Sequence, residues 1–360
     1  MKIGILTLPL HTNYGGILQA YALQTILERM GHKPRLIKRL MRKASIKSIL
    51  RYKCKFLVKE IICLFRFKSN CELKKKKAIL RFIKQYIKTD IYDTFEQIKK
   101  NQYDVIIVGS DQIWRPQYIS DIENAYLNFT SDWNIKRIAY GASFGVSDWE
   151  YTLNQTLSCR RLIQRFDAIS VREQSAVVLC SKYLGVIAQW VLDPTMLLDK
   201  EDYVKIFSLT RTPVNADSLF DYILDETIDK NILIERIANE TGLKPFWKKM
   251  KNEKSVEPSV IEWLNAFYNA KYVVTDSFHG CVFSILFQKN FIVYGNEKRG
   301  LARFQSLLSL FGLENRLVTN LEQNGEFSLE DIDWEIVTKK LQDFRNRSML
   351  FLIMNINNGK

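Results

Sequence analysis

The amino-terminal stretch MKIGILTLPLHTNYGGILQAYALQ, residues 1–24, decides the fold class of the chain. Its apolar run at 2–8 predicts a first strand, and the apolar spacing from Ile17 onward predicts a helix. Between them, Asn13-Tyr14-Gly15-Gly16 offers backbone N–H groups and two positions without side chains, which an anion or a sugar hydroxyl can approach closely. The spacing is not the Gly-x-Gly-x-x-Gly fingerprint of dinucleotide-binding proteins. A tight strand-to-helix turn without a ligand is the alternative.

The rest of the sequence repeats this alternation of short β-branched runs and helical patterns, which is typical of parallel α/β sheets. The expected strands of the first half are 2–8, 33–38, 103–108, 138–142, 168–171 and 189–192, and those of the second half are 219–224, 243–247, 272–275 and 291–294. We therefore expect an α/β protein with two Rossmann-like domains.

The break between the domains is expected near Asp193-Pro194-Thr195, because six strands already fill the first sheet and proline resists continuing either kind of element. This places a first domain at 1–195 and a second domain at 196–325. A carboxyl-terminal helix and tail follow at 326–360, and the helix expected at 332–350 can pack back across the first domain.

Composition describes a globular chain with apolar residues for about two cores, since 47% of the 360 residues are hydrophobic and 26% are charged. No uncharged apolar run approaches the roughly 18 residues of a spanning helix, and the first residues resemble a strand rather than a signal sequence. We therefore expect a cytoplasmic protein. The six cysteines include no Cys-x-x-Cys pair, so neither a disulfide scaffold nor a structural zinc is predicted.

The net charge of +14 is concentrated in one segment. Residues 33–88 contain 20 Lys or Arg against two Glu, a charge of +18, so the other 304 residues together carry −4. In the part of this basic segment at 44–88, apolar residues recur at helical spacing among basic ones. This pattern predicts a basic amphipathic helix pair inserted in the first domain. Such a pair can lie on an anionic membrane surface or cover the first domain as a solvated hairpin. No nucleic-acid-binding signature accompanies the segment, so nucleic acid is not an expected partner.

Three polar loops follow apolar strands, at the place where open α/β sheets bind their ligands. In the first loop, Asp111 can accept a hydroxyl proton and Trp114 can offer its ring to a sugar; a helix cap and a packing residue are the alternative roles. In the second, the forked guanidinium of Arg172 stands beside the backbone N–H groups at the start of a helix, and the two together can bind a carboxylate or phosphate. The alternative is a surface pair of Arg172 with Glu173. In the third, the cations suit phosphate or an ordinary charged loop, and they are Lys298, Arg299 and Arg303.

The strongest candidate is the stretch Thr275-Asp276-Ser277-Phe278-His279-Gly280. His279 is one of only three histidines in the sequence, and it follows the expected strand 272–275 closely. Histidine can hold or deliver a proton near neutral pH. A structural histidine is the alternative, but the strand-end position and the polar neighbours favour a catalytic role.

Five segments, taken in order, resemble the polysaccharide pyruvyl transferase family over about 1–318. They are NYGGILQAYALQ at 13–24, VGSDQIW at 108–114, SVREQ at 170–174, VLDPT at 191–195 and SFHG at 277–280. The resemblance implies a two-domain fold like that of GT-B glycosyltransferases. It also implies transfer of pyruvate from phosphoenolpyruvate onto two hydroxyls of a sugar, which forms a cyclic ketal and releases phosphate.

The resemblance implies roles for individual residues as well. His279 is the expected proton donor or phosphate ligand, and Asp111 as a base is our own inference from its position. The expected donor-binding residues are Arg172, Ser277, Gly280, Lys298, Arg299 and Arg303, and the expected acceptor-binding residues are Asn13, Tyr14, Gly15, Gly16 and Trp114. Family members have Arg two residues before the histidine, where this chain has Ser277, so Lys298, Arg299 and Arg303 are the candidates to replace that cation. No metal and no cofactor is expected, because protein cations can neutralise phosphoenolpyruvate as a co-substrate.

The expected partners are phosphoenolpyruvate and a sugar acceptor linked to polyprenyl diphosphate, met at the inner face of a membrane through 44–88. Two alternatives stay open. One is a GT-B glycosyltransferase that uses a nucleotide sugar. The other is a noncatalytic carbohydrate-assembly protein that docks on the membrane through the same segment.

Overall fold

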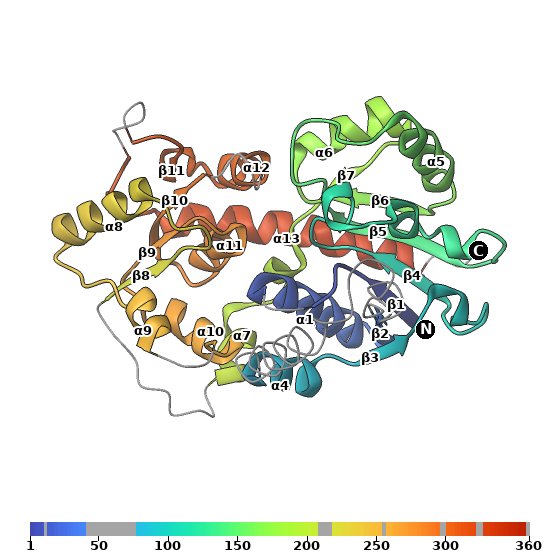
Figure 1. Ribbon diagram of the computed structural model, residues 1–360, viewed down its shortest axis with the longest axis horizontal. Coiled ribbons are helices and arrows are strands. Elements are labelled where there is room, and N and C mark those ends of the chain that lie inside the picture. Colours follow the sequence, from blue (N-terminus) through green and yellow to red (C-terminus); the bar gives the residue numbers. More distant parts are fainter. Residues whose placement is uncertain are drawn as a thin grey trace, which may run out of the picture.

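The computed structural model describes residues 1–10, 13–40, 77–207, 218–253, 257–295, 300–321 and 327–357. It holds two parallel sheets, each flanked by helices, that lie in separate halves of the molecule (Figure 1). The predicted α/β class with two Rossmann-like halves is therefore confirmed.

The first sheet has seven parallel strands in the order β3-β2-β1-β4-β5-β6-β7. Its strands are β1 (Lys2–Leu6), β2 (Lys33–Arg39), β3 (Thr89–Tyr92), β4 (Val105–Val108), β5 (Lys136–Ala142), β6 (Ala168–Val171) and β7 (Gln189–Trp190). The strand order reverses between β1 and β4, and open α/β sheets bind ligands outside the carboxyl ends of the strands at such a point. The helices of this half are α1 (Tyr14–Arg29), α4 (Lys77–Tyr86), α5 (Leu153–Ile163) and α6 (Gln174–Leu179), with a π-helical turn at Cys180–Leu184. Short 3-10 turns are η1 (Phe95–Gln97), η2 (Pro116–Tyr118), η3 (Ile122–Tyr126), η4 (Asn128–Thr130) and η6 (Pro194–Leu197).

The second sheet has four parallel strands in the order β11-β10-β9-β8. Its strands are β8 (Leu219–Tyr222), β9 (Tyr272–Thr275), β10 (Asn290–Tyr294) and β11 (Leu317–Val318). The helices from η6 onward are α7 (Lys200–Phe207), α8 (Ile228–Thr241), α9 (Trp247–Glu253), α10 (Val260–Asn269), α11 (Phe278–Leu286), α12 (Ala302–Phe311) and the 3-10 turn η8 (Glu314–Arg316). Side chains fix where these helices begin: Ser259 and Glu262 form a capping box on α10, which satisfies two backbone N–H groups of the first turn.

The last helix, α13 (Trp334–Asn357), runs from the second half into the first (Figure 1). The backbone N–H of Leu192 donates to Ser348 Oγ over 2.9 Å, and Lys136 Nζ donates to the carbonyl of Asn355 over 3.0 Å. The helix therefore packs against the strands and turns of the first half.

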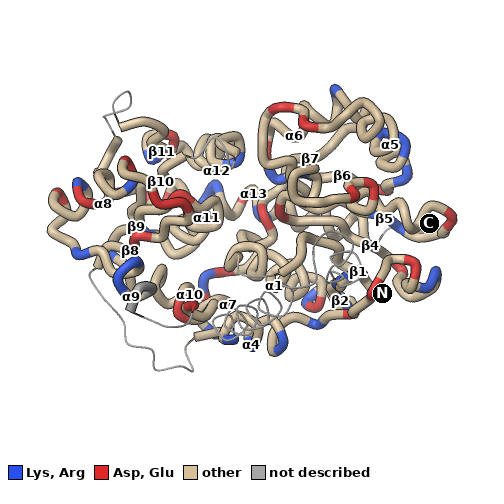
Figure 2. Tube along the Cα trace, in the orientation of Figure 1, with Lys and Arg blue, Asp and Glu red and all other residues tan. Residues whose placement is uncertain are grey.

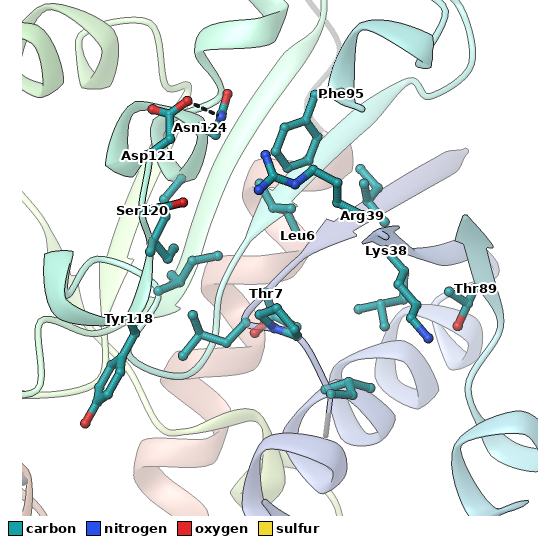
Figure 3. Close-up of a pocket in the computed structure, with 18 of the residues that line it drawn as sticks. Leu6, Thr7, Lys38, Arg39, Thr89, Phe95, Tyr118, Ser120, Asp121 and Asn124 are labelled. Atoms are coloured by element: carbon teal, nitrogen blue, oxygen red, sulfur yellow. Dashed lines mark hydrogen bonds between the residues drawn. The ribbon is translucent and has the colours of Figure 1, made fainter. Parts of the chain in front are cut away.

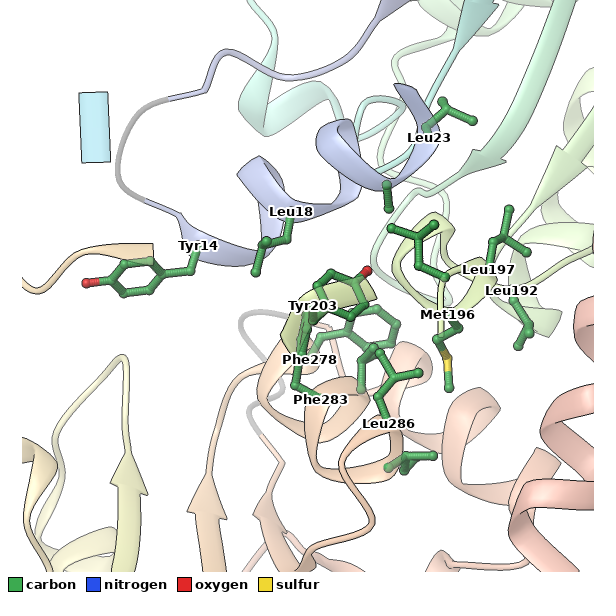
Figure 4. Packing of buried hydrophobic residues seen from close by; sticks show 14 of the residues in the cluster. Tyr14, Leu18, Leu23, Leu192, Met196, Leu197, Tyr203, Phe278, Phe283 and Leu286 are labelled. Atoms are coloured by element: carbon green, nitrogen blue, oxygen red, sulfur yellow. The ribbon is translucent and has the colours of Figure 1, made fainter. Parts of the chain in front are cut away.

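One hydrophobic cluster joins the two halves. Leu18 and Leu23 of α1 lie in the same cluster as Met196 and Leu197 of η6 and Phe283 of α11 (Figure 4). Because the interior is close-packed, this shared core fixes α1 of the first half against α11 of the second. The candidate site lies at the end of this contact.

One strand prediction is wrong, and two strands were missed. Residues 243–247 form no strand; Pro245 makes an isolated bridge to Leu219, and α9 begins at Trp247. The Asp221 carboxylate accepts hydrogen bonds from backbone N–H groups at the start of α9, which stabilises a helix where a strand was expected. The strands β3 and β11 were not predicted.

The predicted basic helix pair at 44–88 lies partly outside the described residues, which resume at Lys77. The described part contains α4, whose Ile79 and Phe82 are buried in the main core. Phe82 and Tyr86 pack edge-on against Tyr21 of α1, so α4 covers the first half.

Elsewhere, basic and acidic residues are interspersed over both halves of the described chain (Figure 2). Within the described ranges, no helix is long and apolar enough to cross a membrane.

Candidate active site

The candidate site is a cavity of about 230 Å³ between the carboxyl edge of the first sheet and the helix starts of the second half. Its walls come from the loops after β1 and β4, the start of α11, and α12. They include Leu8, Asp111, Tyr118, Phe278, His279 and Arg303. Segments far apart in the sequence thus meet at the carboxyl edge of the sheet, where the sequence analysis predicted the ligand-binding loops.

The glycine pair before α1 allows a close approach between the halves. The helix begins at Tyr14 rather than near Ile17. A Cβ built on Gly15 would lie 2.6 Å from His279 Cβ and closer still to the ring, and one on Gly16 would lie 3.2 Å from Asp111 Oδ2. The first turn of α1 therefore rests directly against both predicted catalytic residues, and a side chain at Gly15 does not fit there.

The start of α11 is held by its own residues. The Ser277 hydroxyl accepts a hydrogen bond from the backbone N–H of Gly280 over 3.3 Å, so it caps the helix. A Cβ on Gly280 would lie 2.9 Å from Thr275 Cβ, so the missing side chain lets α11 pack against the end of β9. Ser277 lines the cavity, whereas Gly280 serves packing in this structure.

His279 faces a buried carboxylate. Its Nε2 lies 3.6 Å from Asp193 Oδ2, slightly beyond hydrogen-bond range, and has no hydrogen-bond partner in the described structure. Burial alone would raise the pKa of Asp193, but His279, Arg172 and Thr195 outweigh burial and hold that pKa well below its usual range. Asp193 is therefore an ionised group in position to orient the imidazole.

Arg172 is completely buried and surrounded by three carboxylates. It donates to Asp193 over 2.7 Å and to Asp111 over 3.3 Å, and its Nε lies 3.9 Å from Glu173 Oε2. Burial would lower the pKa of Arg172, but these carboxylates raise it. The alternative of a surface pair with Glu173 is wrong, since both side chains are fully buried. Because its guanidinium neutralises these neighbours, Arg172 organises the site from behind the cavity.

Glu173 ties this ionic cluster to the loop after β5. Its Oε1 accepts hydrogen bonds from the backbone N–H groups of Phe144 (2.9 Å) and Gly145 (3.1 Å). Its Oε2 has no hydrogen-bond partner in the described structure. Burial raises the pKa of Glu173, and Arg172 opposes that shift.

Asp111 projects from a strained turn into the same cluster. Its φ of +63° lies in the left-handed region, which is uncommon for a residue other than glycine and often marks functional sites. Its Oδ1 accepts from the backbone N–H of Gln112 over 2.9 Å and from Arg172, while Oδ2 lies on the side of Gly16. Oδ1 is therefore held by two donors, whereas Oδ2 lies beside the first turn of α1.

Arg303 is the cation that lines the cavity among the described residues. Its guanidinium lies 5.3 Å from the ring centre of Phe278, and Arg172 lies 4.8 Å from the same ring. Burial, together with the charge of Arg172, lowers the pKa of Arg303 to about 10, so it is still a cation at neutral pH. The Gln112 amide oxygen accepts from the guanidinium at 3.0 Å once the amide is turned toward it.

Two predicted acceptor contacts need correction. Tyr14 is buried, donates its hydroxyl to the carbonyl of Pro258 over 2.6 Å and stacks on Trp263. Trp114 is fully buried, donates to the carbonyl of Ala125 over 3.2 Å and stacks on Tyr126. Neither ring faces the cavity, because both are core residues. Asn13 does line the cavity.

Other predictions are not decided by the described residues. Lys298 and Arg299 lie outside them. Within the described ranges, no group of three or more His, Cys, Asp or Glu side chains could hold a metal ion. Metal-free chemistry stays a prediction.

Sequence reasoning missed the roles of Asp193 and Glu173. The stretch Asp193-Pro194-Thr195 was interpreted as a domain break, yet Asp193 carries a charge on which Arg172 and His279 converge. A charged residue directly after an apolar strand-end run, as in Trp190-Val191-Leu192-Asp193, is the signal that could have identified it.

Comparison with known proteins gives a family and a fold. The polysaccharide pyruvyl transferase family profile matches residues 13–298. No curated protein matches the chain significantly. The crystal structure of UDP-GlcNAc 2-epimerase from Neisseria meningitidis, bound to UDP-GlcNAc, aligns over 100% of both chains with a TM-score of 0.51 at 9% identity. MurG from Acinetobacter baumannii aligns over 99% of both chains with a TM-score of 0.45 at 8% identity. The likeness to the epimerase shows the fold alone, which is GT-B-like.

Proposed function

Because the chain belongs to the polysaccharide pyruvyl transferase family, we propose that it moves pyruvate from phosphoenolpyruvate onto two hydroxyls of one sugar residue. The products are a cyclic ketal and inorganic phosphate. The observation that carries this proposal is the meeting of His279, Asp111 and Arg303 at one cavity between the two halves. An acid, a base and a cation are the groups that this reaction needs.

His279 is the proposed acid. The imidazole, whose Nε2 lies toward Asp193, delivers a proton to the methylene carbon of phosphoenolpyruvate. Protonation makes the neighbouring carbon electrophilic, and a sugar hydroxyl then adds to it. Asp193 keeps the ring oriented during this step, and hydrogen bonds of catalytic residues often tighten only when substrate is bound.

Asp111 is the proposed base, through Oδ2. It accepts the proton of the attacking hydroxyl, and phosphate leaves with the electrons of its C–O bond. The second hydroxyl then closes the ring, and its proton passes to the departing phosphate. The turn at Asp111 and the hydrogen bond to Gln112 N hold the carboxylate in place. Such fixed groups accelerate a reaction because they need little reorganisation during it.

Arg303 is the proposed donor-binding cation. The chain has Ser277 where the resemblance leads us to expect Arg, and Arg303 lines the same cavity as Ser277. The first-turn amides of α11 add partial positive charge beside it. Asp111, Glu173 and Asp193 all face Arg172, and Glu173 and Asp111 also interact electrostatically with Arg303. A highly charged donor therefore depends strongly on Arg303.

Phosphate release tests the proposal. Purified protein is incubated with phosphoenolpyruvate and candidate lipid-linked glycans, and products are weighed by mass spectrometry. His279→Ala should lower kcat by about 10²–10⁴ while the protein stays folded, because a general acid is lost. His32→Ala, a change near the amino terminus, is the matched control. Nucleotide release from a sugar nucleotide, without phosphate release, would instead support a glycosyltransferase. The absence of both phosphate release and nucleotide release would support a noncatalytic protein.

We also propose that the acceptor is carried on polyprenyl diphosphate and met at the inner, cytoplasmic face of the membrane. The charge of +18 over residues 33–88 supports this, since each basic residue near an anionic surface contributes about 1 kcal/mol. Deleting 44–76 spares α4, whose side chains belong to the core. Wild type should float with anionic vesicles at low salt and the deletion should not; no flotation of wild type contradicts the idea.

A further inference from the structure

A second cavity lies beside the reaction cavity at the carboxyl edge of the first sheet. It measures about 150 Å³, and the ends of β1 and β2 and the turns η2 and η3 contribute to its walls. Leu8 and Tyr118 line both cavities, so the two spaces share a wall. The second cavity is thereby a neighbour of the reaction cavity.

The walls of this cavity combine an apolar surface with polar ends. Leu8, Ile37, Ile113 and Ile119 are among the apolar residues that line it. Lys38 and Arg39 lie across the cavity from Ser120, Asp121 and Asn124 (Figure 3). Arg39 lies over the Phe95 ring at 5.3 Å, and Asn124 donates to Asp121 over 2.6 Å, so both polar ends are held by neighbours.

This combination matches a sugar unit in its chemistry. Apolar walls suit the C–H face of a sugar ring. Asp121 and Asn124 can bind its hydroxyls, whereas Lys38 and Arg39 suit a carboxylate or a phosphate group.

We propose that the second cavity binds the acceptor, by a sugar unit next to the one that receives pyruvate, and that it favours an acceptor with an anionic group. The proposal rests on the proposed function, since it needs a donor in the neighbouring cavity. Transfer between two substrates requires their reacting atoms to lie close together, and the two cavities are neighbours that share a wall at Leu8 and Tyr118. The anionic group lies at the end with Lys38 and Arg39.

Direct binding tests the proposal without any turnover. The probes are lactose, a galactosyl–glucuronic acid disaccharide and lactose 1-phosphate, each titrated into the full chain by calorimetry. The two anionic probes should bind about tenfold or more tightly than lactose, because charge-assisted hydrogen bonds are the stronger ones. The glucuronic acid and phosphate arms identify which anion is preferred.

Two variants probe the cavity from its exposed rim. Lys38→Glu should abolish the preference for the anionic probes, and Lys33→Glu, an exposed change at the other end of β2, should leave it intact. Ser120→Trp should weaken all three probes about tenfold or more by filling the space, whereas Gln117→Trp, on a neighbouring exposed residue, should not. Binding of phosphoenolpyruvate should be unchanged in all four variants.

The outcomes separate this proposal from the proposed function. No saccharide binding by wild type, or binding that neither Lys38→Glu nor Ser120→Trp weakens, would overturn the acceptor cavity. If these variants do weaken saccharide binding, but the protein releases no phosphate from phosphoenolpyruvate, the result would support the second cavity as an acceptor site. It would contradict phosphoenolpyruvate as the donor.

Discussion

The close approach of α1 to His279 makes Gly15→Ala an informative substitution. A Cβ at this position would lie 2.6 Å from His279 Cβ, whereas ordinary contacts begin near 3.4 Å. His279 Nδ1 and Cγ would lie closer still, and because Cβ at the root of the side chain is also too close, a rotamer change alone cannot relieve the overlap. The imidazole and the helix must separate by about 0.8 Å or more, and a misplacement of about 1 Å can cost about 10²-fold in rate. We therefore expect kcat to fall about 10²-fold.

Folding should survive this change. Alanine is favoured over glycine in a helix by about 1 kcal/mol, whereas overpacking a filled interior costs about 1–3 kcal/mol. The net loss in the free energy of unfolding is then about 0–2 kcal/mol, which urea denaturation measures. A large effect on kcat with a small effect on stability is the expected signature.

Gly16→Ala is a comparison in the same turn, because it gains the same helix propensity. Its Cβ would lie 3.2 Å from Oδ2 of Asp111, the proposed base, which is a milder overlap than that at Gly15. We therefore expect a smaller fall in kcat than for Gly15→Ala. A folded Gly15→Ala protein whose phosphate release equals that of wild type would refute the placement of His279 against α1.

Three further predictions concern buried groups. Asp193→Asn should lower the free energy of unfolding by about 2–4 kcal/mol near pH 7, because it leaves Arg172 partly uncompensated. The folded pKa of Asp193 lies below its unfolded value, so its stabilisation is present above about pH 4 and is lost at lower pH, and the difference in urea midpoints should shrink there. Arg303→Gln should raise KM for phosphoenolpyruvate about 10-fold or more with a smaller change in kcat, whereas Arg236→Gln on the exposed face of α8 should change neither; equal KM values would remove Arg303 from the donor site. Burial raises the pKa of Cys180 to about 12 and also raises those of Cys159 and Cys281, so iodoacetamide should label these three thiols only after unfolding; rapid labelling of the native protein, located by peptide mass, would contradict their burial.

The strands that could be predicted from the sequence are the fully buried ones, because they consist almost entirely of apolar residues. Val105–Val108 and Tyr272–Thr275 are buried along their whole length, so their apolar runs identify them. The edge strand Thr89–Tyr92 has polar residues and one buried side chain, and it carries no such signal. The error at 243–247 has a tertiary cause, because the helix start after Pro245 depends on Asp221, some 25 residues away.

The candidate site divides in the same way. His279 and Asp111 could be predicted, since polar residues at strand ends face the ligand edge of a parallel sheet. The aromatic residues Tyr14 and Trp114 could not be placed, because their burial results from partners such as Trp263 and Tyr126. The role of Arg172 depends on three carboxylates that the fold brings together. The spacing of residues near Arg172 in the sequence does not predict this set of ion pairs.

The proton that His279 delivers provides the most direct test of the proposed chemistry. Purified protein, phosphoenolpyruvate and an acceptor glycan are incubated in D2O, and both phosphate and the mass of the glycan are measured. Protonation of the methylene carbon predicts inorganic phosphate together with a ketal whose methyl group carries one deuterium, and amounts of both products lower by about 10²-fold or more from folded His279→Ala in the same time. A ketal without deuterium, or no phosphate from phosphoenolpyruvate with any acceptor, would contradict the account.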